Sequence, residues 1–296
     1  VQNCRGATLG WGCSVSKQTS FKILEDVARD LSGDKVSFPT FLDITFQVRT
    51  ALKNPNLNVE QLAQLVSAEP LMSAKIISMS NSVAMNPGGR AVADVRTAIN
   101  RVGMEAVRTV SFAVAMEQLL KSKNMQPFEG LSQRLWEHTV HVAALCRLLS
   151  RKQARINPDE AMFAGLVHDI GVFYLLSRAA NFPDLIADKA ELHALLVQWH
   201  DNIGHALLAA MGQPDDVLKA VQEHELERRV GELRTLSDVL YVANKIANTM
   251  TSWRDPAFGS AVDTSALSDL FDAEAVKQLL DESGEEVASL KSALVG

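Results

Sequence analysis

Hydrophobic residues recur at three- and four-residue steps along almost the whole chain, and this spacing limits the fold more than any other feature. The segment "FPTFLDITFQVRTAL" shows it after Pro39, and "AVRTVSFAVAMEQLL" is a nearly continuous apolar ridge. Tight Asn-Gly or Asp-Gly turns between alternating segments, which mark β-hairpins, are not found in the sequence. The chain is therefore predicted to be all-α, with an N-terminal helical subdomain packed on a second helical domain.

Capping residues mark several helix boundaries. Asn58 is predicted to be an N-cap with Gln61 completing a capping box, and that helix should stop at Pro70. Asn157 should cap a helix that has Pro158 as its first residue. After the helices that follow Pro39 and Asn58, further helices are predicted at 71–81, 94–100, 104–121, 131–152, 158–168, 170–180, 189–211, 214–226, 232–252 and 273–292.

The helical periodicity lapses in "KSKNMQPFEG", residues 121–130, where Pro127 and Gly130 interrupt the chain. This is the predicted boundary between two groups of helices. The predicted organisation is a leader or flexible end, an N-terminal helical subdomain, a second helical domain, and a C-terminal loop and helix, at residues 1–20, 21–125, 126–255 and 256–296 respectively.

Composition excludes several classes of protein. A hydrophobic content of 47% with 22% charged residues is ordinary for a globular protein, and each apolar run is interrupted before the roughly 20 residues that span a bilayer. Residues 1–125 hold 14 Lys and Arg against 10 Asp and Glu, a small excess that makes nucleic acid an unlikely partner. Three irregularly spaced cysteines, Cys4, Cys13 and Cys146, provide no disulfide framework, so a cytoplasmic location is expected.

All seven histidines fall in the second group of helices, which is the strongest chemical signal in the sequence. Two of them, His193 and His205, are expected to be exposed or hydrogen-bonded core residues. His168 and Asp169 interrupt the apolar run "AGLVHDIGVFYLL", where polar groups are costly unless something pairs with them. Imidazole and carboxylate groups suit zinc, iron, manganese or nickel. From the local chemistry alone, a metal site and a structural hydrogen-bonded pair are equally supported.

The order of motifs resembles the HDOD family, a divergent all-α branch of the HD superfamily of metal-dependent phosphohydrolases. The resemblance extends over residues 36–250. It rests on "VEQLAQLVSAEPLMSAKIISMSNS", "VADVRTAINRVGMEAVRTVSF", "LWEHTVHVAALCRLLS", "DEAMFAGLVHDIGVFYLL" and "WHDNIGHALLAAMGQPDDVLKAVQEHE". It implies an HD-type helical domain after the N-terminal subdomain.

The resemblance also implies a set of metal ligands. His138 matches the first histidine of the superfamily, and His168 with Asp169 matches its name-giving doublet. The segments "HDNIG" and "EHE" are similar to the further histidine positions of HD-GYP proteins, which implies His200 and His224 as additional ligands. The last metal-binding aspartate of the superfamily is matched by Asn244, a degenerate position. Asp238 should not replace it, because six residues along a helix turn it about 120° away.

Three departures from the superfamily concern catalysis. Asn244 is a neutral ligand, Val172 stands where catalytic relatives often have lysine, and no Gly-Tyr-Pro segment follows Glu225. They favour a signal-transduction module with little or no hydrolase activity that binds a partner protein or a nucleotide.

Two alternatives remain open. The first is a metal-dependent phosphohydrolase that acts on a nucleotide or phosphate ester, with His168 and Asp169 as its catalytic residues. The second is a structural site, in which a bound ion only holds the helices together. The resemblance leaves open whether an ion of iron, manganese, nickel or zinc is bound, and which oligomer forms.

Overall fold

The computed structural model describes residues 12–32, 43–82, 85–86, 88–152, 155–254, 267–268 and 270–294. These residues form α-helices and a 3-10 helix, and they contain no strand. The all-α prediction is therefore confirmed. The predicted start of a helix at Pro39 lies outside the described residues, as do residues 1–11 and the predicted loop over 255–266.

The first group of helices follows the predicted order. The helix that begins at Val59 ends at Ser67, shortly before Pro70. Pro70 is the first residue of the next helix, where its missing N–H costs nothing. Asn58 and Gln61 form the predicted capping box. The helices are α1 (Gly12–Ser32), α2 (Asp43–Leu52), α3 (Val59–Ser67), α4 (Pro70–Asn81), α5 (Val95–Val102) and α6 (Met104–Leu120).

Helix α1 begins at Gly12, inside the stretch 1–20 that was predicted to be a leader or flexible end. The helix packs because Ile23 and Val27, four residues apart, are both buried. The Ser20 hydroxyl also donates to the Glu191 carboxylate at 2.6 Å, which joins α1 to the second group of helices.

The second group of helices begins without a separating linker. The predicted boundary forms the 3-10 helix η2 (Lys123–Phe128), which contains Pro127 and continues directly into α7. Two predicted helices are shorter than expected, and α10 was not predicted. The elements are α7 (Glu129–Lys152), α8 (Pro158–Val167), α9 (Ile170–Ala179), α10 (Pro183–Ala187), α11 (Lys189–Ala210), α12 (Asp215–Glu223), α13 (Leu236–Asn248) and α14 (Ala273–Leu294).

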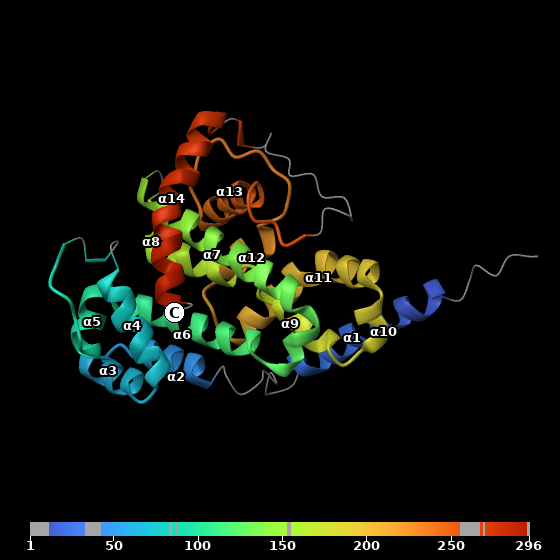
Figure 1. Ribbon diagram of the computed structural model, residues 1–296, viewed down its shortest axis with the longest axis horizontal. Helices are drawn as coiled ribbons and strands as arrows, with labels where there is room; N and C mark the ends of the chain where they lie inside the picture. The colour runs from blue at the N-terminus through green and yellow to red at the C-terminus, as the bar shows by residue number, and fades with distance from the viewer. Residues whose placement is uncertain are drawn as a thin grey trace, which may run out of the picture.

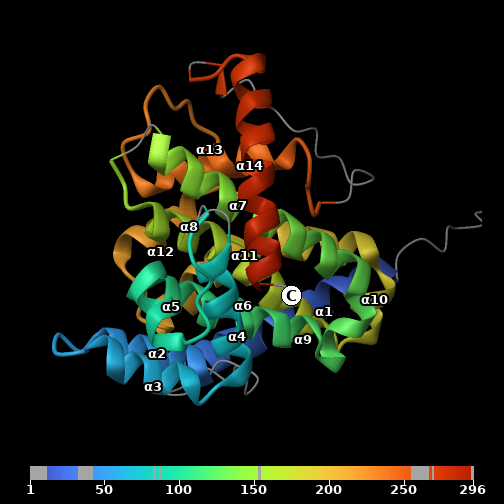
Figure 2. The same ribbon diagram turned by 60° about the vertical axis from the view of Figure 1, so that its left-hand side comes forward.

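Helix α14 joins the two groups. Helices α2 to α5 lie together at one end of the molecule, and α14 runs from the opposite end down to α4 and α6 (Figures 1 and 2). It packs on both α7 and α4. The buried guanidinium of Arg147 on α7 forms ion pairs with Glu286 of α14 and, at 3.6 Å, with Asp159 of α8. Helix α14 thereby holds the first group of helices against the second.

Helices α8 and α9 form the centre of the molecule. Within the described residues, one stretch, Pro158–Ala179, is long and apolar enough to cross a membrane. However, 94% of its 18-residue apolar window is buried inside the protein. It is also divided by His168 and Asp169, which separate α8 from α9. Such burial is typical of a core helix pair.

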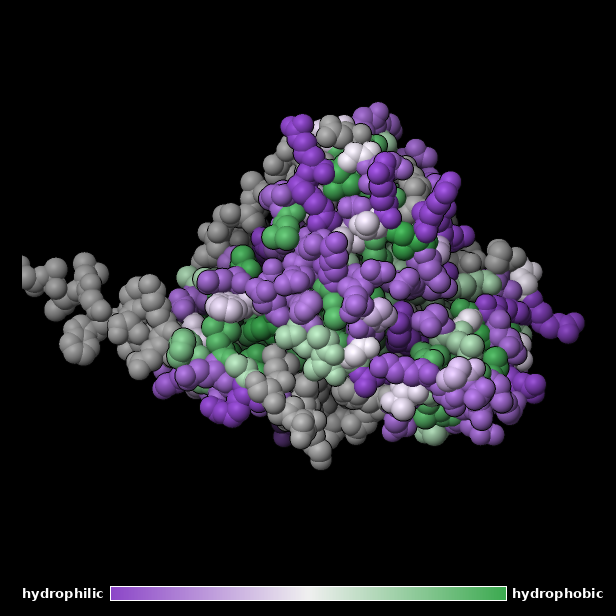
Figure 3. Space-filling view, turned by 180° about the vertical axis from the view of Figure 1, so that it is seen from behind, coloured by the Kyte–Doolittle hydropathy of each residue, from purple (hydrophilic) through white to green (hydrophobic). Residues whose placement is uncertain are grey.

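On the face seen in Figure 3, hydrophilic side chains predominate and apolar ones form smaller groups between them.

Gly171 permits the close contact between α9 and α11. A Cβ atom at this position would lie 1.9 Å from the carbonyl oxygen of His200 and 2.8 Å from the backbone nitrogen of Gly204. Since both are backbone atoms, no side-chain rotation could relieve the contact. The glycine therefore sets the distance between the helix that starts at Asp169 and the helix that carries His200.

We expect Gly171→Ala to lower the free energy of unfolding by about 3 kcal/mol or more, because the added methyl group forces two helix backbones apart. The matched control is Gly284→Ala, since a Cβ atom at Gly284 meets nothing within 4 Å. That helix-interior change should stabilise the protein by about 1 kcal/mol. Urea denaturation of both variants measures the difference, and equal effects would contradict the assigned contact.

Candidate metal centre

Six predicted site residues from five parts of the second helical group meet at one buried point. Each is 3% exposed or less. Helix α7 supplies His138, the junction of α8 and α9 supplies His168 and Asp169, and α11 supplies His200. His224 is the C-cap of α12, and Asn244 lies on α13. The structure thus brings together side chains that are up to 106 residues apart in the sequence.

The Asp169 carboxylate is the centre of this cluster. Its Oδ2 atom lies 3.1 Å from Nε2 of His168 and 3.9 Å from Nε2 of His138. Its Oδ1 atom lies 3.7 Å from Nε2 of His200 and 3.6 Å from Nε2 of His224. The residues therefore form two potential ion-binding groups that share Asp169, and within each group the ligand atoms lie within 4.8 Å of one another.

Backbone carbonyl groups orient three of the histidines. The Nδ1 atoms of His168, His200 and His224 lie 2.8, 2.9 and 2.6 Å from the carbonyl oxygens of Gly165, Leu196 and Val221, respectively. A carbonyl oxygen only accepts, so each Nδ1 carries a proton and donates it. In the neutral form of each ring, Nε2 then holds a lone pair directed toward the cluster, an arrangement typical of metal-ligating histidines.

The donor set fits a divalent cation. Nε2 of His168, His200 and His224 and both oxygens of Asp169 are buried without a hydrogen-bond partner among the described residues. Acceptor atoms that face one another in a buried site repel each other unless a cation or a proton lies between them. Imidazole nitrogen and carboxylate oxygen are ligands of iron, manganese, nickel and zinc.

The protonation of the cluster follows from burial and from neighbouring charges. Burial disfavours the charged imidazolium form and lowers the pKa of His138 to about 3 and that of His200 to about 4. Burial alone would raise the pKa of Asp169, but the charge interaction and hydrogen bonding with His168 and its neighbours hold it well below its ordinary value. His138 and His200 are therefore neutral, and the Asp169 carboxylate beside them is ionised.

Asn244 changes the part of the cluster that contains His138. Its Oδ1 atom accepts a hydrogen bond from Asn248 and lies 3.0 Å from Nε2 of His138. With this amide orientation, Nε2 of His138 donates to Asn244 and presents no lone pair to an ion. His141, one turn further along α7, donates from Nδ1 to the carbonyl of Glu137 and is not part of the cluster.

Four further residues discussed above lie outside the cluster. The Asp238 carboxylate accepts hydrogen bonds from Thr235 at the start of α13, which accounts for its absence from the cluster. Val172 is fully buried in α9. His205 lies outside the cluster, with Nδ1 at 3.3 Å from the carbonyl of Leu218. His193 is half-buried and its ring lies 6.4 Å from that of Trp253.

Three residues at the edge of the cluster were not predicted. The Glu225 carboxylate lies 3.8 Å from Nε2 of His200 and 4.0 Å from Nε2 of His224, and it forms an ion pair with Arg254. The ring of Trp253 lies 5.8 Å from that of His200 at an interplanar angle of 77°. Glu225 could have been found because it directly follows His224. Trp253 and Arg254 lie after α13 in a segment without a helical pattern, so no sequence signal indicated their position.

Known proteins provide an independent comparison. A family model of the HDOD domain matches residues 38–226. None of the curated proteins matches the chain significantly.

Solved structures share the fold. A candidate metal-dependent phosphohydrolase from Shewanella amazonensis is 22% identical, with a TM-score of 0.68 over 93% of this chain and 99% of that chain. An HDOD domain protein of unknown function from Geobacter sulfurreducens is 16% identical, with a TM-score of 0.63 over 94% and 99%. A candidate signal transduction protein from Marinobacter aquaeolei is 19% identical, with a TM-score of 0.63 over 94% and 65%.

We expect the metal-free protein to lose stability as the pH falls from about 6.5 toward 4. Unfolded histidines take up protons near pH 6.5, whereas His138 and His200 stay neutral in the folded state until about pH 3 and about pH 4. Proton uptake thus favours unfolding, by about 2 kcal/mol per pH unit for the two groups together. Asp169 contributes little in this range because its carboxylate is ionised in both states.

Urea denaturation in the presence of a chelator, at half-unit steps from pH 7.5 to 4.5, measures this dependence. A His205→Asn variant is the control and should show the same slope, because His205 lies outside the cluster. A free energy of unfolding that does not change between pH 7 and pH 5 would contradict the assignment of neutral buried histidines.

Proposed function

This chain belongs to the HDOD family, and from this premise we propose that it is a regulatory signal-transduction module that binds a divalent ion but has little or no hydrolase activity. We further propose that it acts in the cytoplasm through a partner protein or a nucleotide. The free, buried thiol of Cys146 supports a reducing location. The ion would be held by His168, Asp169, His200 and His224.

The observation that carries this proposal is the closure of the site. The imidazole and carboxylate groups of the cluster are at most 1% exposed. On the side of His200 and His224, the ion pair between Glu225 and Arg254 and the buried ring of Trp253 cover them. A hydrolytic metal centre needs an open coordination position and space for its substrate beside the ion. We infer that Glu225, Arg254 and Trp253 restrict the access of a substrate to the cluster from this side.

Two further features oppose hydrolysis. Asn244 supplies no negative charge where a second carboxylate would balance an ion, and its amide oxygen pairs with His138. Val172 has an apolar, fully buried side chain that cannot contact a phosphate group. A bound ion would supply positive charge beside Asp169 and would connect the junction of α8 and α9 to α11 and α12.

A phosphohydrolase remains the second candidate because the ligand set is largely intact. The four histidines and Asp169 lie in one cluster, and three of the histidines have their Nε2 atoms oriented for an ion. In this alternative, the segment that contains Trp253 and Arg254 would have to move away before a phosphate ester could enter.

We expect the protein purified without chelator to contain about one transition-metal ion per chain, and chelation to lower the melting temperature. At a free ion concentration one hundred times Kd, binding stabilises the folded state by about 2.7 kcal/mol. His168→Ala should lose the ion and this stabilisation. His193→Ala is the matched control and should keep both, because His193 lies outside the cluster. Elemental analysis and thermal unfolding provide the measurements.

The same preparations should show no turnover of a generic phosphodiester or phosphomonoester with added manganese or nickel. Turnover that His168→Ala abolishes would support the phosphohydrolase and overturn the regulatory proposal. A protein that contains no metal and whose stability is unaffected by added ions would show that the cluster is a purely structural hydrogen-bonded core.

We expect Asn244→Asp to raise the affinity for a divalent ion about tenfold, because a carboxylate replaces a neutral amide beside His138. The matched control is Asn248→Asp, which adds the same charge one helical turn away and contacts Asn244 rather than His138. Competition against a metal-sensitive dye measures both affinities. Equal affinities for both variants would show that position 244 does not reach the ion.

A further inference from the structure

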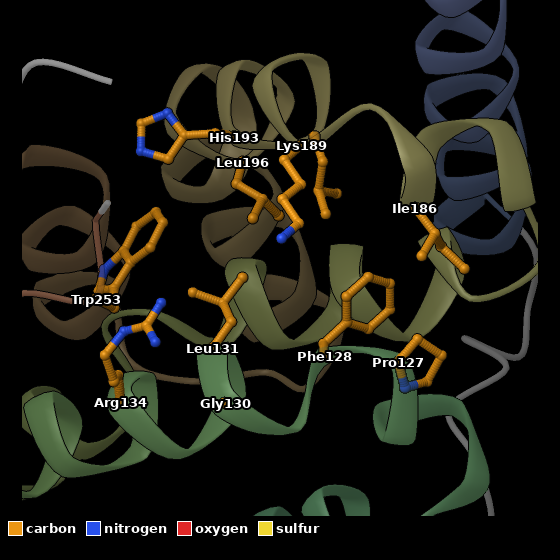
Figure 4. Close-up of a pocket in the computed structure, with 11 residues that line it drawn as sticks. Pro127, Phe128, Gly130, Leu131, Arg134, Ile186, Lys189, His193, Leu196 and Trp253 are labelled. Atoms are coloured by element: carbon orange, nitrogen blue, oxygen red, sulfur yellow. The ribbon is translucent and has the colours of Figure 1, made fainter. Parts of the chain in front are cut away.

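A cavity beside the metal centre has no role in the function proposed above. Its volume is about 260 Å³, and it lies between the start of α7, helices α10 and α11, and Trp253 (Figure 4). This is slightly below the roughly 300 to 1,000 Å³ of sites that hold drug-sized ligands. The cavity therefore suits a small molecule and not a polymer.

The walls of the cavity are mainly apolar. Phe128 and Leu131 line it from the junction of η2 and α7, and Leu196 lines it from α11. Trp253 adds a flat aromatic surface that is only 2% exposed. Aliphatic and aromatic walls of this kind bind the apolar part of a ligand, and a few polar groups then fix its orientation.

The charged groups of the cavity are all basic. Arg134 of α7 and Lys189 of α11 extend their cationic ends toward the space between the two helices (Figure 4). Both side chains are exposed, and neither has an ion-pair partner among the described residues. No aspartate or glutamate lines the cavity. The cavity therefore offers an apolar interior with uncompensated positive charge.

The position of Lys189 supports a role in binding. Lys189 is the first residue of α11, where a positive charge is unfavourable for the helix dipole. Helix stability therefore does not explain a lysine at this position. An anion placed between Lys189 and Arg134 would compensate both charges.

We propose that this cavity binds a small amphiphilic anion, namely a medium-chain aliphatic or aromatic carboxylate. Its carboxylate would contact Lys189 and Arg134, and its apolar part would pack against Leu131, Leu196 and Trp253. The site is separate from the metal centre because none of the cluster residues lines it. The proposal does not depend on whether the cluster holds an ion.

The cavity and the metal centre nevertheless share a wall. Leu196 lines the cavity with its side chain, and its carbonyl oxygen orients Nδ1 of His200. The ring of Trp253 also lies against the ring of His200. A bound carboxylate would therefore contact two of the residues that pack on His200, and the fluorescence of Trp253 provides a local readout of binding.

Octanoate, octanol and octylammonium are suitable probes because they share an alkyl chain and differ in charge. Each is titrated into the full chain, and binding is followed by calorimetry and tryptophan fluorescence. We expect octanoate to bind at least tenfold more tightly than octanol, and octylammonium not to bind. A Trp253→Phe variant should keep octanoate binding in the calorimeter but lose most of the fluorescence change.

Charge-removing variants test the assigned contacts. Lys189→Gln and Arg134→Gln should each weaken octanoate binding several-fold, and together they should make it as weak as that of octanol. Both residues are exposed, so the variants should fold, as thermal unfolding can verify. Arg151→Gln removes an exposed charge from the same helix α7 away from the cavity and should have no effect.

Two results would overturn the proposal. One is the absence of octanoate binding to the folded protein. The other is octanoate binding that equals octanol binding and is unchanged in the Lys189→Gln, Arg134→Gln double variant. Metal content, measured on the same samples, tests the proposed function separately, because a metal-free protein could still bind octanoate.

Discussion

The buried carboxylate of Asp169 is the constraint on which the second helical domain depends. A carboxylate removed from water is costly unless charge or hydrogen-bond donors compensate it, and the oxygens of Asp169 lie 3.1 to 3.9 Å from the Nε2 atoms of four histidines. The imidazole rings must come from three surrounding helices and the α8–α9 junction. Their arrangement in turn requires the close contact of α9 with α11 that Gly171 permits. The packing of the helices and the geometry of the site therefore depend on each other.

The candidate ligand atoms of the cluster point toward one another, and polar and charged side chains surround them. Nε2 atoms of three histidines remain directed at Asp169, held by backbone carbonyl groups of their own helices. Around them, an amide occupies position 244, and the guanidinium of Arg254 neutralises Glu225. Burial lowers the pKa of Arg254, but a paired arginine remains charged at neutral pH. A site with these features supports ion binding better than it supports turnover.

Helix α11 connects the two sites of the molecule. It carries His200 toward the ion cluster and presents Lys189 and Leu196 to the adjacent cavity. Trp253 separates the two spaces and contacts the ring of His200. If an ion and a small anion occupy these spaces, any effect of one on the affinity for the other must be reciprocal. The shared wall offers a direct physical route for such an effect in a regulatory module.

Patterns in the sequence predicted the fold class, most helix boundaries and the residues that the structure brings together in the cluster. Hydrophobic periodicity and capping residues are local signals, which is why Asn58, Gln61 and Pro70 predicted their helix ends correctly. The order of motifs further indicated His138, His168, Asp169, His200, His224 and Asn244. Local signals did not indicate α1, where Ser20 bonds to Glu191, 171 positions away, or α10, which is only five residues long.

The surroundings of these candidate ligands follow from the packing of the helices. The hydrogen bond from His138 to Asn244 and the position of Glu225, Arg254 and Trp253 beside the cluster depend on distances between helices. Such distances result from backbone approach and side-chain packing over the whole core, which no pattern within one helix encodes. The sequence therefore specifies which imidazole and carboxylate groups are present, and the packing of the helices determines that these groups are buried.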